Sequence, residues 1–102
     1  MTVDTPPARE MTTWIVERFW PGVSAEAVTA AAARLRRSTA DLRAAGRSIR
    51  YLGSALMPVD EEVLCFFEAR SSGDVAAANR LAEVPVDRIS LVMTFGMANP
   101  RQ

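Results

Sequence analysis

Hydrophobic and polar positions divide the chain into four strand-like and two helix-like segments. The stretch VLCFFEA at residues 63–69 is almost wholly apolar and has turn residues at both ends, which is typical of a central strand buried on both faces. Strand-like patterns also cover residues 12–20, 48–57 and 88–95. In residues 12–20, alternate positions point to opposite faces, so both faces of this strand carry bulky apolar groups.

The two other segments have apolar residues three and four positions apart, as in helices. Ser24 is expected to cap a first helix that ends at Gly46. Ser72 is expected to cap a second helix, from Asp74 to about Val84. The predicted buried stripe of this second helix is Val75, Ala78, Leu81 and Ala82.

The order of these segments predicts a ferredoxin-like βαββαβ domain of the α+β class, of the dimeric α+β barrel type. One four-stranded antiparallel sheet would carry both helices on the same face. The expected domain covers residues 12–95, between a flexible arm at 1–11 and a tail at 96–102. Gly53, inside a strand pattern, indicates a bulge.

The face of the sheet without helices is expected to be apolar as well. Four strands about 4.8 Å apart and about 17 Å long present roughly 350 Å². Monomers seldom expose an apolar patch of that size without a function or a partner to cover it. The sequence therefore predicts a homodimer, a pocket for a hydrophobic small molecule, or both.

Composition excludes several classes of function. Twelve arginines balance twelve acidic residues, so no net field attracts nucleic acid or an anionic membrane. No apolar run reaches the roughly 20 residues of a membrane span, and the polar N-terminus does not look like a signal peptide, so a cytoplasmic protein is expected. The chain has no histidine and one cysteine, so no metal ligands and no cofactor are predicted.

Two carboxylates stand inside otherwise apolar strands, Glu17 and Glu68, and they are the predicted catalytic residues. In an apolar pocket, desolvation would raise a carboxyl pKa and make the group a usable acid or base. The alternative is an ion pair at the sheet rim with Arg18, Arg50 or Arg70. The pairing register decides whether the two carboxylates share a face, and pattern alone does not give the register.

Five residues are predicted to bind a ligand. They are Trp14, Arg18, Tyr51, Phe66 and Arg88. Trp14, together with Trp20, would supply flat apolar walls, the Tyr51 hydroxyl would orient the ligand, and Arg88 would bind a carboxylate. Packing in the core or at a dimer interface is the alternative role of the aromatic residues, and bracing of the preceding loop is the alternative role of Arg88. Cys65 is expected to be a buried structural thiol.

With these elements placed, the chain resembles a bacterial family of small ferredoxin-like proteins of unknown function that includes a nickel-binding dimer. The resemblance is carried by WIVERFWPG at residues 14–22, RYLGS at 50–54, CFFEARSSGDV at 65–75 and VPVDRI at 84–89. It implies the fold, a dimer, and a cavity between the sheet and its partner. The nickel branch holds its metal by histidines, which this chain lacks, so nickel binding is not carried over.

The leading expectation for function is a dimeric protein that binds a small molecule. If it is an enzyme, a cofactor-free cyclase, isomerase or dehydratase with a pocket glutamate fits the residues best. The alternatives are a protein that stores or senses a metal such as nickel through carboxylates and Cys65, and a structural dimer without catalysis.

Overall fold

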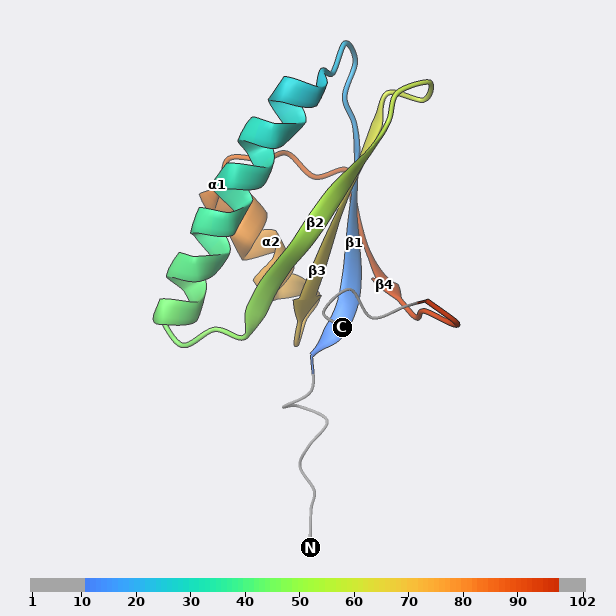
Figure 1. The fold of residues 1–102 in the computed structure, drawn as a ribbon. Helices are drawn as coiled ribbons and strands as arrows, with labels where there is room; N and C mark the ends of the chain where they lie inside the picture. The colour runs from blue at the N-terminus through green and yellow to red at the C-terminus, as the bar shows by residue number, and fades with distance from the viewer. Residues whose placement is uncertain (1–10, 98–102) are drawn as a thin grey trace, which may run out of the picture.

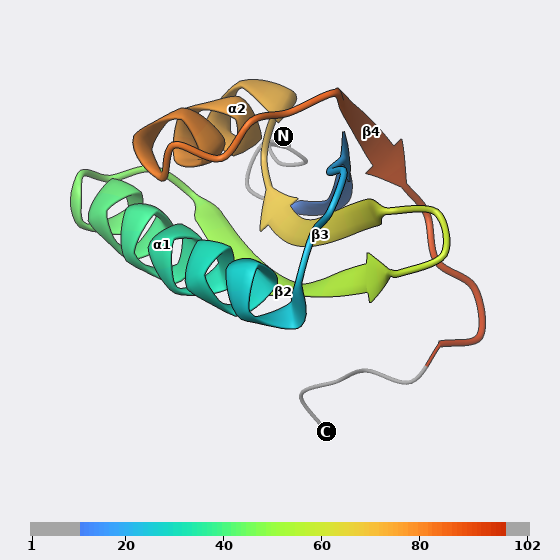
Figure 2. The same ribbon diagram turned by 90° about the horizontal axis from the view of Figure 1, so that it is seen from above.

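The computed structural model describes residues 11–97, which form one antiparallel sheet and two helices (Figure 1). In chain order the elements are β1 (Thr12–Phe19), α1 (Ala25–Ala44), β2 (Ile49–Met57), β3 (Glu62–Ala69), α2 (Ser72–Leu81) and β4 (Arg88–Val92). The strand order is β2-β3-β1-β4, and every neighbouring pair is antiparallel. Both helices lie on one side of the sheet (Figure 2). The predicted ferredoxin-like α+β fold is therefore confirmed.

β3 is the strand around which the sheet is built, because it pairs with β2 on one side and β1 on the other. Its burial alternates along the whole strand: Val63, Cys65, Phe67 and Ala69 are buried beneath the helices, and the residues between them are half-buried. The predicted bulge is present at Gly53, where the β2–β3 register shifts. Gly53 has a φ of 145°, a backbone conformation that residues with a side chain rarely adopt.

Both helices begin at a serine, but the second begins at a different serine from the one predicted. Ser24 Oγ accepts a hydrogen bond from Ala27 N at 3.1 Å. Ser71, not Ser72, caps α2: its backbone is extended and its Oγ accepts from Asp74 N at 3.3 Å. Two adjacent serines can both cap, and the choice depends on where β3 ends. Within the described part of the chain, neither helix is long and apolar enough to cross a membrane.

Two further predictions are wrong in detail. Asn79, not Leu81, completes the buried stripe of α2, because positions 75, 78, 79 and 82 share one side of a helix and Leu81 lies 55% exposed at its edge. The last strand ends at Val92 rather than Phe95, because β4 pairs with β1, whose first residue is Thr12. Most of the predicted arm (1–10) and tail (98–102) lies outside the described residues.

The helix side of the sheet holds the core, and two titratable groups lie in or beside it. The Cys65 thiol accepts a hydrogen bond from Ser54 Oγ at 3.0 Å, and Ser54 shares a second one with the Tyr51 hydroxyl at 2.5 Å. Burial raises the pKa of Cys65 above its ordinary 9.0 and that of Tyr51 above its ordinary 10.0, and the bonds to Ser54 oppose both shifts. Cys65 is thus the buried thiol that was predicted.

Truncating Leu35 tests the position of the core. Leu35 is fully buried between α1 and the sheet, so Leu35→Ala should lower the free energy of unfolding by about 2–5 kcal/mol. Leu81→Ala, the same change at an exposed site on α2, should cost less than about 1 kcal/mol. Urea unfolding followed by circular dichroism measures both. Equal losses for the two variants would contradict this placement of the core.

The raised pKa values predict a loss of stability in alkali. The unfolded chain releases the Cys65 and Tyr51 protons at lower pH than the folded chain, so the free energy of unfolding should fall as pH rises above about 9. The chain has one cysteine and one tyrosine, so each contribution can be removed by a single substitution. Cys65→Ala should flatten the decline between roughly pH 8 and 10, and Tyr51→Phe only above about pH 10. Unchanged slopes in both variants would overturn the assignment.

Candidate functional site

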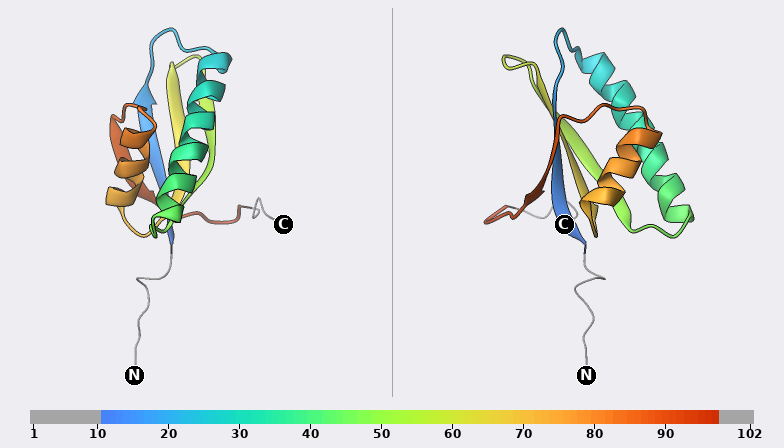
Figure 3. Two further views of the ribbon diagram at one scale, coloured as in Figure 1. Left: turned by 90° about the vertical axis from the view of Figure 1, so that its left-hand side faces the viewer. Right: turned by 180° about the vertical axis from the view of Figure 1, so that it is seen from behind.

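The face of the sheet opposite the helices, here called the open face, is the candidate site. Residues directly opposed on neighbouring strands share a face, so the register assigns its members. They are Thr13, Ile15, Glu17, Phe19, Arg50, Ala55, Met57, Glu62, Leu64, Phe66, Glu68, Arg88, Ser90 and Val92. Figure 3 shows this side of the sheet free of both helices.

The two predicted catalytic carboxylates both lie on the open face, and each forms an ion pair across strands. Glu17 Oε2 lies 3.6 Å from Arg88 Nε, which joins β1 to β4. Glu68 Oε1 lies 3.6 Å from Arg50 Nη1, which joins β3 to β2. Arg50 was among the expected rim partners, whereas the pairing of Glu17 with Arg88 was not foreseen. Arg88 Nε also donates to Ser90 Oγ at 3.2 Å.

Sharing a face does not bring the two carboxylates together. Glu17 stands opposite Leu64, and Glu68 is four residues further along the same strand. At about 3.4 Å per residue this is a separation of roughly 14 Å. Within one chain, therefore, Glu17 and Glu68 cannot act on the same reacting atom as an acid and base pair.

An apolar band fills the space between the two ion pairs. Its residues are Ile15, Ala55, Leu64 and Phe66, with Ile15 directly opposite Phe66 and Leu64 directly opposite Ala55. Phe66 also faces the bulge at Gly53. Beyond the band, Phe19 and Met57 are exposed at one end of the face. The open face therefore has an apolar centre with a charged pair at two of its margins.

Three of the predicted ligand-binding residues lie on the other side of the sheet. The indole Nε1 of Trp14 donates to Ala69 O at 3.1 Å. The Arg18 guanidinium stacks 3.8 Å from the centre of the Trp20 ring, and burial lowers its pKa. The ring of Tyr51 packs against Phe67 with centroids 5.5 Å apart. Trp14, Arg18 and Tyr51 thus pack against the helix-side core, apart from Phe66, Arg88 and the two carboxylates.

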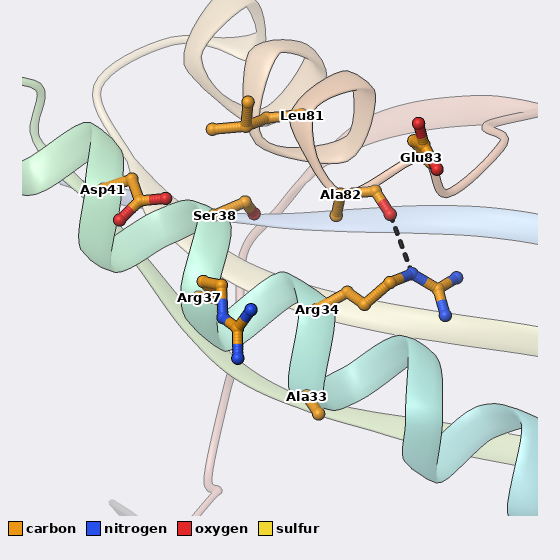
Figure 4. A pocket seen from close by; sticks show the side chains of 8 residues that line it. All are labelled: Ala33, Arg34, Arg37, Ser38, Asp41, Leu81, Ala82 and Glu83. Atoms are coloured by element: carbon orange, nitrogen blue, oxygen red, sulfur yellow. Dashed lines mark hydrogen bonds between the residues drawn. The ribbon is translucent and has the colours of Figure 1, made fainter.

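A groove that the sequence did not suggest runs between α1 and α2 (Figure 4). It has a volume of about 330 Å³, and both basic and acidic side chains from α1 and the end of α2 line it. Arg34 Nε donates to Ala82 O at 2.9 Å, so this arginine caps the C-terminal end of α2. The only signal in the sequence was the run of charges beside the small-residue stripe of α1.

The described residues do not provide donors for a transition metal within one chain. Borderline metals such as nickel favour imidazole and thiolate ligands. The chain has no histidine, and the Cys65 thiol is buried on the helix side, where desolvation keeps it protonated. Residues 11–97 contain no group of three or more His, Cys, Asp or Glu residues that could hold a metal ion.

Comparison with known proteins agrees with this fold and with the resemblance seen in the sequence. The family whose model matches is described as "Nickel responsive protein SCO4226-like", and the match covers residues 14–92. The matched region spans nearly all of the sheet and both helices, more than half of the 102 residues. No curated protein and no solved structure matches the chain. The chain belongs to the SCO4226-like family of nickel-responsive proteins.

Proposed function

We propose that this protein is a homodimer that binds an apolar small molecule between the open faces of its two chains. The observation that carries the proposal is the apolar band of Ile15, Ala55, Leu64 and Phe66, which neither helix covers. Pairing two such faces would remove both bands from water. Burial of apolar surface yields about 25 cal/mol per Å², so even a few hundred Å² per chain supplies a substantial driving force.

The two ion pairs support a ligand site rather than a plain interface. Small-molecule sites combine apolar walls with a few polar groups that fix the orientation of the ligand. Here the walls are the apolar band, and the polar groups are Glu17 with Arg88 and Arg50 with Glu68. Both pairs are partly exposed, so a ligand could replace either partner at little cost. An apolar body bearing a carboxylate or a hydroxyl would satisfy both features.

The proposal covers binding and not turnover. A glutamate that acts as a base must reach the proton it removes, and each carboxylate here is 3.6 Å from an arginine and roughly 14 Å from the other along the sheet. Cofactor-free cyclisation or isomerisation by Glu17 or Glu68 stays a prediction. It would require the partner chain to provide the second acidic or basic group.

Placing a charge in the apolar band should separate the dimer and abolish binding. Ile15→Asp puts a carboxylate opposite Phe66, so the dissociation constant of the dimer should rise by roughly 100-fold or more. Sedimentation velocity measures this change. The fluorescence of N-phenyl-1-naphthylamine, a neutral apolar probe, should increase with the wild-type protein and not with the variant.

Val59→Asp is the matched control, because Val59 is 94% exposed in the turn between β2 and β3 and its substitution adds the same charge away from the band. It should leave both the dimer and the probe fluorescence unchanged. A monomeric wild-type protein, or a dimer that both substitutions affect equally, would refute the proposal.

A second candidate function is nickel binding, which the name of the family favours. The carboxylates on the open face are those of Glu17, Glu62 and Glu68, which are hard oxygen ligands that suit magnesium or manganese better than nickel. A nickel site would have to combine carboxylates from two chains, and it would lack the imidazole that nickel prefers.

Calorimetric titration separates the two candidates. With NiCl₂ added to the wild-type protein, we expect no saturable heat and no change in melting temperature, because the chain offers no imidazole and no accessible thiolate. The Glu17→Gln, Glu68→Gln double variant is the control. Saturable nickel heat in the wild type that this variant loses would favour nickel binding over the apolar ligand.

A further inference from the structure

The end of β4 and the residues that follow it carry exposed apolar side chains at alternate positions. Leu91 is 56% exposed, Met93 75%, Phe95 82% and Met97 73%. Leu91 stands opposite Trp14 and so lies on the helix side of the sheet, whereas Met93, Phe95 and Met97 follow the last paired residue. Single exposed apolar residues are ordinary on protein surfaces, but three within five residues are typical of a segment that meets a partner. Residues 93–97, here called the apolar segment, hold three of the four.

The position of the apolar segment explains why its own chain leaves it uncovered. The β1–β4 ladder ends at the pair Thr13 and Val92, so the segment begins where the sheet stops. From there it runs away from both helices, on the side of the sheet that they do not occupy (Figures 1 and 3). The helices therefore cannot shield Met93, Phe95 and Met97, and a molecule that approaches the open face would meet them first.

The polarity of the segment matches the centre of the open face. Its sequence, MTFGM, carries no charge, and the apolar band between the two ion pairs carries none either. Methionine side chains are flexible and polarisable, which lets them fit irregular apolar surfaces. The nearest complementary surface available to the segment is thus an open face like the one beside it.

We propose that residues 93–97 of each chain pack against the open face of a second copy, as exchanged arms of the homodimer. This inference rests on the proposed dimer. A two-fold dimer is self-complementary, so each arm leaves one chain and covers the other. The sheet face alone has a footprint of roughly 350 Å², whereas a stable interface buries about 800 Å² per partner. Phe95 adds on the order of 150 Å², and Met93 and Met97, which are 75% and 73% exposed, add further area.

The arms also deepen the proposed binding site. Phe95 and the methionines of one chain would lie over the apolar band of the other, so the ligand would contact side chains from both chains. The substrate class that fits such a cavity is a flexible apolar molecule, since methionine-lined walls repack around different shapes.

Photo-crosslinking from position 95 tests the arm directly. The photoreactive residue p-benzoylphenylalanine replaces Phe95 in one sample and Val59 in the control. Unlabelled and ¹⁵N-labelled chains are mixed, so that a crosslink between two chains is recognised by its mass. We expect position 95 to give species of twice the chain mass, linked to open-face peptides of the other chain, and position 59 to give none. Links from position 95 to its own chain only, or no links, would overturn the inference.

Substitution within the arm provides the second test. The Met93→Ser, Phe95→Ser double variant should raise the dissociation constant of the dimer at least about tenfold and weaken N-phenyl-1-naphthylamine binding. Its monomer should unfold like wild type, because both side chains are exposed. A monomeric wild-type protein would refute the proposed function itself. A wild-type dimer whose dissociation constant this variant leaves unchanged would refute the arm alone.

Discussion

Two helices can cover only one face of a four-stranded sheet, and most features of this protein depend on that limit. β3 shows it most clearly, since Val63, Cys65, Phe67 and Ala69 are at most 5% exposed while the alternate residues are only half-buried. The hydrophobic effect stabilises the helix side within one chain. The same strand presents Leu64 and Phe66 on the open face, where both are only half-buried. The core on the helix side therefore stabilises the fold, while the open face keeps an apolar surface that the same chain does not cover.

The sheet also divides the reactive groups by chemistry. Burial raises the pKa values of the Cys65 thiol and the Tyr51 hydroxyl, which keeps both neutral and makes them poor nucleophiles. Glu17 and Glu68 are on the open face instead, where each lies 3.6 Å from an arginine. Ion pairs of this exposure contribute only about 0–1 kcal/mol each, so exchanging an arginine for a ligand group costs little. The accessible chemistry and the uncovered apolar surface thus occupy the same face.

Much of the fold was predictable from the sequence, because local signals and packing agree. The nearly continuous apolar run at residues 63–69 identified the central strand, although only one of its faces is buried within the chain, and Gly53 marked the bulge. The errors arose where tertiary contacts determine the structure. Ser71 caps α2 in place of Ser72, and Leu81 lies outside the buried stripe of that helix. The site was less predictable. Parity along one strand separates Glu17 from Trp14, but only the register between strands pairs Glu17 with Arg88 and Arg50 with Glu68.

This chain belongs to a family described as nickel responsive but contains no histidine, which illustrates that function belongs to side chains placed on a scaffold. The scaffold still imposes a constraint that is independent of the metal. On such an apolar face, contact with a second sheet and contact with a ligand compete. A ligand that lies between two sheets separates them and reduces their direct contact. A dimer that holds a ligand there must recover the lost contact at the margins of the sheet. The exposed residues that follow β4 stand at such a margin, so in the proposed dimer the end of this edge strand would couple ligand binding to dimer stability.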